Sequence, residues 1–409
     1  MMKPYCSKLT LIITALFFFC MNASGQELPP CGTSLLMESS TGNDYYPEVN
    51  AIIENYQSEK SDRSTLVIPI VFHLIYNTTE QNIDDSLIHQ QIQRLNLDFQ
   101  KLNADTINTP EAFKPFTGSM DIEFCLARIS PEGDITNGIL RIATDETIFP
   151  SATSYDVPDP VKHTITGGSD AWNTSDYMNI WICNLTGSTA YTAPPGNFVD
   201  PADDGIVCHY NHIGNSGVAP YDLGRSIVHE MAHWLGLKHI WGDDGGTCEG
   251  TDYMADTPNQ ANWTAGCPDF PLLDACTPDG AGVMYMNYMD YSRDDCRNMF
   301  SIAQVLYMQS FYDAIMPTYY TIDKCTVDDA GIPSEYEKAV VTFFNETLTV
   351  KSNAMISTFN IYNLNGQLLE TSNVMGSEHS VAIQYTGMFI LEIIYESDRP
   401  GERVKFIMN

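Results

Sequence analysis

The segment 229–239 carries the residues whose types and spacing most directly indicate chemistry. His229 and His233 lie four residues apart, so on a helix they share a face and can direct imidazole nitrogens at one ion. Glu230 follows His229, about 100° further round the helix, which predicts a carboxylate beside the metal rather than bound to it. There it can accept a proton from metal-bound water.

A third histidine completes this pattern. Gly236 is predicted to end the helix, because glycine accepts the left-handed conformation, and His239 follows as the third ligand. Three histidines and a water molecule form the open tetrahedral zinc site typical of catalysis. The sequence therefore predicts one catalytic Zn²⁺, with Glu230 as the general base.

Apolar periodicity predicts the elements that position this segment. Residues 66–76 form an apolar run typical of a buried strand. A helix should follow, capped by Asp84 or Asp85, with apolar residues at spacings of four and three (Ile88, Ile92, Leu95, Phe99 and Leu102). Further strands are predicted near 122–126, 179–185 and 205–210, with helices over 221–235 and 301–315.

The 409 residues divide into four predicted segments. Residues 1–25 resemble a secretory signal, with Lys3 and Lys8 before a short apolar run. A pro-segment over 26–63, a catalytic domain over 64–325 and a C-terminal domain over 330–409 follow. No later apolar run reaches about 18 residues, so the mature protein is predicted to lack a membrane span.

The net charge of −32 excludes general nucleic-acid binding, because a phosphate backbone would repel the chain. Two of eleven cysteines lie in the signal, and the odd remainder predicts at least one free thiol. Four cysteines fall between 248 and 296 and predict local disulfides, but spacing alone allows three pairings.

Several motifs connect residues 66–315 with a known family. This region resembles the metzincin zinc endopeptidases, and within them the ulilysin-like branch of the pappalysin family (M43). The resemblance implies an α+β fold, with a twisted mixed sheet, long helices and a loop-rich lower subdomain, and a metalloendopeptidase acting on proteins or peptides. It rests, beyond the zinc motif, on Leu223-Gly224-Arg225, Asn96-x-Asp98-Phe99, Pro131-Glu132-Gly133, Thr136-Asn137-Gly138-Ile139, Asp256-Thr257-Pro258 and Asn287-Tyr288-Met289-Asp290-Tyr291.

The same resemblance implies roles for residues after the zinc motif. Met289 matches the Met-turn beneath the metal. Tyr291 matches a tyrosine whose phenol could stabilise the oxyanion of the tetrahedral intermediate, a packed tyrosine being the alternative. The implied disulfides are Cys248–Cys276 and Cys267–Cys296.

Two further assignments concern acidic residues. Asp252 and Thr257 match a calcium loop, with Asp243, Asp244 and Asp256 nearby; ordinary surface acids are the alternative. Asp295 matches a position lining the pocket for the residue after the scissile bond. A buried carboxylate there would prefer Arg or Lys, whereas an ordinary loop acid would not.

The pro-segment contains Cys31-Gly32-Thr33. A thiolate is a strong zinc ligand that can replace the catalytic water, and ulilysin-like precursors use a cysteine in this way. We therefore expect Cys31 to keep the precursor latent, the alternative being a disulfide to Cys125 or another cysteine. Residues 189–193 are predicted to form the edge strand that pairs with extended substrate.

Beyond Cys325, short strands and a hairpin turn at Asn365-Gly366 predict a small all-β sandwich. Segments 361–367, 386–391 and 405–407 resemble the C-terminal sorting domain of type IX secretion cargo, although Thr386-Gly387-Met388 departs from its usual Gly-x-Tyr. The resemblance implies the type IX machinery as a partner. A carbohydrate-binding or adhesive module is the alternative.

Together these features predict a secreted zinc endopeptidase, exported through the periplasm as a latent precursor and monomeric. A secreted adhesin with a degenerate protease fold is the alternative hypothesis.

Overall fold

The computed structural model describes residues 31–33, 65–326, 340–344, 347–363, 368–382, 387–395 and 402–408. The predicted signal peptide, most of the predicted pro-segment and the predicted turn at Asn365-Gly366 lie outside these residues.

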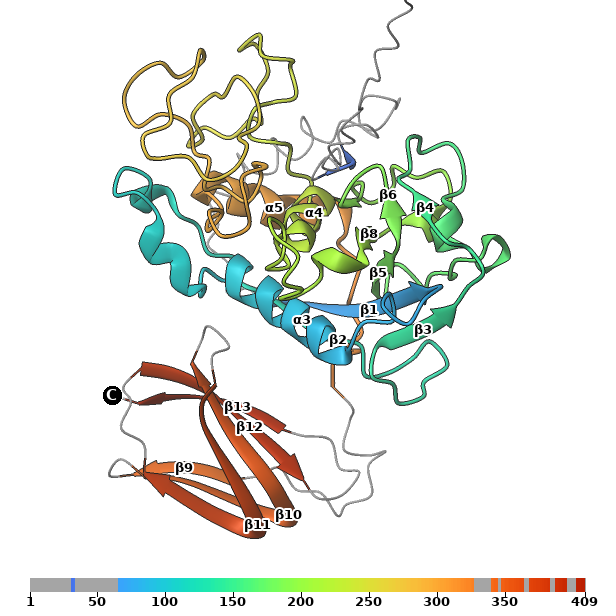
Figure 1. The fold of residues 1–409 in the computed structure, drawn as a ribbon, viewed down its shortest axis with the longest axis vertical. Coiled ribbons are helices and arrows are strands. Elements are labelled where there is room, and N and C mark those ends of the chain that lie inside the picture. Colours follow the sequence, from blue (N-terminus) through green and yellow to red (C-terminus); the bar gives the residue numbers. More distant parts are fainter. Residues whose placement is uncertain are drawn as a thin grey trace, which may run out of the picture.

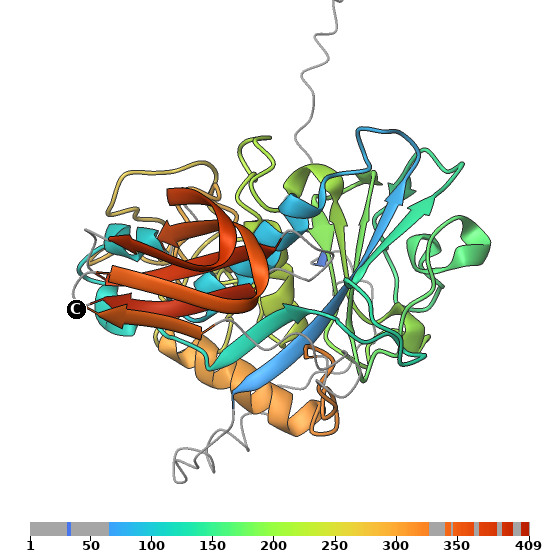
Figure 2. The same cartoon turned by 90° about the horizontal axis from the view of Figure 1, so that it is seen from below.

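A six-stranded mixed sheet forms the centre of residues 65–326 (Figure 1). Strands β2, β1, β5, β8 and β7 follow one another, and β3 also pairs with β1. All pairs are parallel except β7–β8, in which the edge strand β7 is antiparallel. β2 and β3 pair with successive halves of β1 (Figure 2). The strands are β1 Leu66–Tyr76, β2 Ile122–Leu126, β3 Ile139–Ala143, β5 Met178–Cys183, β7 Ala190–Tyr191 and β8 Ile206–His209.

Side chains that alternate between the two faces of the buried strands contribute to two hydrophobic cores. In β5, Ile180 and Ile182 join the large core on the helix side, whereas Trp181 and Cys183 join a smaller core on the other face. Successive strand side chains point to opposite faces, so this central strand is apolar throughout. A short parallel pair, β4 Phe149–Pro150 with β6 Leu185–Thr186, lies beside the second core.

In the described residues three α-helices accompany the sheet: α3 Asp85–Phe99, α4 Arg225–Trp234 and α5 Ile302–Ile315. The Asp84 side chain caps α3 by accepting a hydrogen bond from Ser86 N at 2.8 Å. At α5, Ser301 and Gln304 form a reciprocal capping box. The long segment between α4 and α5 is loop-rich, as predicted (Figure 1).

Several boundaries differ from the predictions. α4 begins at Arg225 rather than 221, because Gly224 adopts a left-handed conformation with φ of 76°. α3 ends at Phe99, so Leu102 lies beyond it. The strands β3 and β4 and most of β11 were not predicted; β11 is rich in polar residues and lacks the alternation that signals a strand.

Three disulfides join described residues: Cys248–Cys276, Cys267–Cys296 and Cys125–Cys325. The first two are the pairings implied by the family resemblance, and both lie in the loop-rich region. The third links β2 to the end of the catalytic region across 200 residues of sequence. Cys31, Cys183 and Cys208 are free and buried.

The C-terminal region is all-β, as predicted. Its strands form one antiparallel sheet in the order β11-β10-β12-β13, with β9 also paired to β10. Buried residues such as Phe359, Leu391 and Ile393 form a small core of their own. In the described part of the chain, no helix has the length and hydropathy needed to cross a bilayer. The strands are β9 Val340–Phe344, β10 Thr347–Asn363, β11 Leu368–Ala382, β12 Gly387–Tyr395 and β13 Glu402–Met408.

Candidate active site

The three predicted zinc ligands converge. His229 and His233 lie on one face of α4, and their Nε2 atoms are 3.0 Å apart. His239 Nε2 lies 3.2 Å from that of His229 and 3.0 Å from that of His233. All three side chains are buried.

The other nitrogen of each ring is held by an acceptor. His229 Nδ1 faces Tyr288 O at 2.6 Å, and His233 Nδ1 faces Leu237 O at 2.7 Å. Burial lowers the pKa of His229 well below its ordinary value and that of His233 to about 3, so both rings are neutral. With the proton on Nδ1, each Nε2 lone pair points at the other two rings.

This arrangement fits a tetrahedral zinc ion. Zn–N bonds of about 2.0–2.1 Å place tetrahedral ligand atoms about 3.3 Å apart, close to the observed separations. Three converging lone pairs repel one another unless a cation lies between them. The donor set and its spacing therefore suit zinc.

Gly236 makes the turn that returns His239 to the site. Its φ is +88°, and an added Cβ would lie 2.5 Å from the ring of Phe311 in α5. A side chain at this position would meet both backbone strain and a steric clash. Glycine is therefore required by the chain reversal and by the packing of α5.

Asp243 orients His239. Its two carboxylate oxygens lie 2.9 and 3.0 Å from His239 Nδ1, and the His239 ring stacks on Trp241. The sequence predicts Asp243 near a calcium loop instead. Because ligating histidines usually donate their second N–H to a carboxylate or carbonyl, an aspartate four residues after His239 was a detectable signal.

Glu230 lies beside the histidines and is fully buried. Burial raises its pKa to about 7, and hydrogen bonds from Cys31 and Thr33 partly oppose this shift. Thr33 Oγ1 donates to Glu230 Oε2 at 2.7 Å, while Oε1 has no hydrogen-bond partner among the described residues. A carboxylate in this environment can gain and release a proton near neutral pH.

Residues 31–33 lie along the edge strand β7 and its continuation. Gly32 N donates to Ala190 O at 2.8 Å, and Thr33 Oγ1 accepts from Thr192 N at 3.1 Å. The Cys31 sulfur and one nitrogen from each of the three histidines all lie within 4.8 Å of one another. The alternative Cys31–Cys125 disulfide is wrong, because Cys125 is bonded to Cys325.

Met289 and Tyr291 follow in the segment beneath the histidines. Met289 is fully buried, and its carbonyl oxygen accepts from Ile240 N at 3.3 Å. The Tyr291 ring lies 5.0 Å from the His239 ring and 5.7 Å from the His229 ring, measured between centroids. The Met-turn region and the zinc motif are thus brought together.

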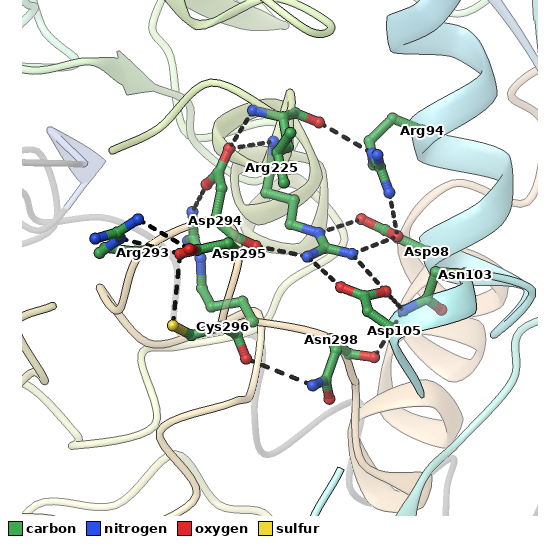
Figure 3. Close-up of polar contacts among 12 residues, drawn as sticks. Arg94, Asp98, Asn103, Asp105, Arg225, Arg293, Asp294, Asp295, Cys296 and Asn298 are labelled. Atoms are coloured by element: carbon green, nitrogen blue, oxygen red, sulfur yellow. Dashed lines mark hydrogen bonds and ion pairs between the residues drawn. The ribbon is translucent and has the colours of Figure 1, made fainter. Parts of the chain in front are cut away.

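A buried ion cluster positions the start of α4 (Figure 3). Arg225 donates from Nε to Asp98 of α3 at 3.0 Å and from Nη1 to Asp105 at 2.7 Å. Nη1 also donates to Asp294 O at 2.5 Å. Arg94 completes the link by contacting Asp98. The cluster joins α3, α4 and the segment after the Met-turn.

The Asp294 carboxylate caps α4 from a distant part of the chain. Its Oδ2 accepts from Leu223 N at 2.9 Å and from Arg225 N at 3.2 Å, and its Oδ1 pairs with Arg297. An acid at this end of a helix satisfies free N–H groups and complements the helix dipole. Arg225 and Asp98 enter the sequence-based prediction only as motif residues, and Asp294 has no predicted role.

Asp295 differs from its neighbour. The sequence-based argument needed a buried carboxylate, whereas the Asp295 side chain is 53% exposed and pairs with Arg293 at 2.8 Å. Asp294 faces the protein interior, and Asp295 is the acid of this pair that faces solvent (Figure 3). Any pocket that uses Asp295 therefore has an exposed, already paired acid.

The predicted calcium-loop residues lie together, but their acidic neighbours have other partners. Thr257 Oγ1 donates to the buried Asp252 at 2.8 Å, and burial raises the pKa of Asp252 to about 7. Asp244 accepts hydrogen bonds from its own loop, including one from Gly250 N at 2.7 Å. Asp256 accepts from Ser301 Oγ and Ala303 N at the start of α5.

Comparisons with known proteins agree with this geometry. A family model for M43 peptidases, described as pregnancy-associated plasma protein-A, matches residues 164–313. A solved mirolysin in complex with compound 9 is 47% identical, with a TM-score of 0.62, and the match covers 65% of this chain and all of that one. A promirolysin mutant from Tannerella forsythia is 44% identical, with a TM-score of 0.62, and the match covers 71% of this chain and 96% of that one.

Curated relatives match over shorter stretches. An extracellular metalloprotease from Arthroderma benhamiae is 39% identical over 110 residues, which are 27% of this chain and 36% of that protein. Extracellular metalloprotease 1 from Coccidioides posadasii is 35% identical over 175 residues, which are 41% of this chain and 59% of that protein. The chain thus spans about a third to three-fifths of these two relatives. Taken with the full-length match to mirolysin, these findings show that the chain belongs to the pappalysin-like M43 family of metallopeptidases.

Proposed function

We propose that this protein is a secreted zinc-dependent endopeptidase made as a latent precursor. The observation that carries the proposal is the convergence of three buried Nε2 atoms beside the buried Glu230 carboxylate. The relatives named extracellular metalloproteases support both the activity and the location.

The roles of the side chains follow from their positions. Zinc bound by the three histidines would polarise the scissile carbonyl and lower the pKa of its water. Glu230 accepts a proton from the attacking water and delivers it to the leaving amine nitrogen, as its buried position beside the histidines allows. Tyr291 donates a hydrogen bond to the developing oxyanion.

Latency uses two residues of the pro-segment. The Cys31 sulfur lies beside the three histidine nitrogens and would be the ligand that replaces the catalytic water on a bound zinc ion. Thr33 donates a 2.7 Å hydrogen bond to Glu230 and so blocks one oxygen of the general base. Removal of residues 26–63 would release both contacts at once. The likeness to a promirolysin supports synthesis as a precursor.

The preference for Arg or Lys after the scissile bond rests on Asp295. In the absence of substrate its partner is Arg293, whose guanidinium a basic substrate side chain would replace. An exposed pair of this kind is weak, so the exchange costs little free energy. Replacing Asp295 by alanine should then reduce the selection of basic residues at that position, and an unchanged cleavage profile would refute the assignment.

Calcium and export complete the proposal. Burial of Asp252 disfavours the ionised form of its carboxyl group, so a cation bound at Asp252 and Thr257 would stabilise the carboxylate.

We assign residues 1–25 to a signal peptide, 64–325 to the catalytic domain and 330–409 to a type IX sorting domain of a monomeric enzyme. Loss of secretion on deletion of 330–409 would support that assignment, whereas secretion without surface binding would favour an adhesive module.

The activity is tested with purified protein after removal of the pro-segment. We expect one zinc per chain, cleavage of casein that a chelator abolishes, and restoration by added zinc. Glu230→Gln should keep the metal and reduce turnover at least about a hundredfold, because general-base catalysis contributes that much or more. Retained activity in this variant, or chelator-resistant cleavage, would contradict the mechanism.

A further inference from the structure

The edge strand β7 has a short main-chain ladder. It consists of Ala190 and Tyr191, and two residue pairs join it to β8. On its other side Gly32 N donates to Ala190 O at 2.8 Å. Once the pro-segment is removed, an extended substrate would pair with the same backbone groups. So short a strand depends on side-chain contacts to keep this edge in place.

Tyr191 provides such a contact on the face of the sheet opposite α4. Ala190 belongs to the large core on the helix side, whereas Tyr191 belongs to the smaller core, because successive strand side chains alternate between faces. The Tyr191 side chain is fully buried, and its hydroxyl donates to Asp159 Oδ2 at 2.6 Å. A hydrogen bond to a carboxylate is stronger than one between neutral groups, so it holds β7 firmly to this earlier segment.

A buried lysine fixes the Asp159 carboxylate in turn. Lys162 is fully buried, and its Nζ lies 3.5 Å from Asp159 Oδ2 and donates to Asp203 O at 2.6 Å. Asp159 N donates to Asp203 Oδ2 at 3.0 Å. The ammonium group also lies 4.2 Å from the centroid of the Phe198 ring, a favourable cation–π distance. The acceptor of the Tyr191 hydroxyl is therefore held from several directions.

The position of these groups separates them from the chemistry. The zinc motif begins on α4, on the other face of the sheet, and none of the three polar side chains belongs to the group of potential metal ligands. A buried ion pair adds little net stability compared with apolar packing, but each charge must stay beside its partner. The cluster therefore restrains the geometry of β7 and acts on a substrate only through that strand.

We propose that Asp159, Lys162 and Tyr191 are positioning residues that hold β7 where its backbone pairs with substrate. This inference rests on the proposed endopeptidase activity. Backbone pairing is made in the ground state and in the transition state alike, so weakening it raises KM and leaves kcat nearly unchanged. A net hydrogen bond of ordinary strength corresponds to roughly three- to tenfold in an equilibrium constant, which sets the size of the expected rise in KM.

The test is steady-state kinetics of the activated enzyme on an extended fluorogenic peptide. Tyr191→Phe keeps the ring in the core and removes only the hydroxyl. Tyr177→Phe is the matched control, because Tyr177 is 1% exposed and its hydroxyl donates to Ile129 O at 2.8 Å in a separate core. Zinc content and Tm, measured on both variants, establish that each is folded.

We expect Tyr191→Phe to raise KM roughly three- to tenfold and to keep kcat within about twofold of wild type. Tyr177→Phe should lower Tm by a similar amount and leave KM unchanged. An unchanged KM in folded Tyr191→Phe would overturn the inference, and so would an equal rise in both variants, since that would mean general loosening. Failure of the proposed function would look different, because wild type itself would then show no chelator-sensitive cleavage.

Discussion

Replacing Arg225 by methionine should destabilise this protein far more than a comparable change at its surface. The Arg225 guanidinium is fully buried and contacts Asp98, Asp105 and the Asp294 carbonyl oxygen. Methionine retains much of the apolar volume but leaves the buried Asp98 with only the 3.4 Å contact to Arg94. The effect is therefore one of uncompensated charge rather than of a cavity.

The expected magnitude follows from that burial. Removing one partner of a buried ion pair costs about 3–5 kcal/mol of unfolding free energy. For a catalytic region of this size, about 2–4 °C of Tm is lost per kcal/mol, so Tm should fall by roughly 6–20 °C. The Asp294 carboxylate would still cap α4 through backbone N–H groups, so folded protein should still bind zinc.

Thermal unfolding followed by circular dichroism, with zinc content measured on the same samples, checks this prediction. Arg293→Met is the matched control, because Arg293 and Asp295 form an exposed ion pair in the same region (Figure 3). Solvent screens that pair, so its loss should cost less than about 1 kcal/mol. If Arg225→Met lowers Tm no more than Arg293→Met does, the buried cluster does not stabilise the fold as argued.

Three further outcomes are expected. Cys31→Ala should raise the activity of the full-length precursor. Thr33→Val should raise that activity less, because this variant frees Glu230 but leaves the Cys31 sulfur in place. If both variant precursors are as inactive as wild type, the latency scheme is refuted. Asp204 is buried and accepts from Trp234 Nε1 at 2.8 Å, and burial raises its pKa to about 6. Its folded-state pKa lies above the unfolded value of 3.8, so the folded protein loses stability as pH rises from about 4 to about 6 and keeps that loss at higher pH. Asp204→Asn should therefore raise Tm more at pH 8 than at pH 5, and an equal shift at both pH values would contradict this. Gly236→Ala should lower the zinc content and Tm together, because its Cβ would meet Phe311 at 2.5 Å; unchanged metal binding would show that the turn adapts.

Local patterns in the chain were enough to predict much of the scaffold. The apolar run Leu66–Tyr76 is β1, and the periodic segment after Asp84 is α3. Ser301 caps the last helix of the catalytic region, at the edge of the predicted range. These features depend on residues within a few positions of one another, and short-range periodicity and capping are visible in any single sequence. The start of α4 was missed because a left-handed Gly224 and a distant Asp294 define it.

By itself, the sequence determined the identity and spacing of the candidate zinc ligands, because a helical repeat and a glycine turn bring His229, His233 and His239 together locally. Only the tertiary structure decided what surrounds them. Thr33 reaches Glu230 from 197 positions away, and Asp295 faces solvent while Asp294 is buried. Both facts depend on how distant segments pack and on which side chains that packing desolvates, and residue spacing along the chain does not contain this information.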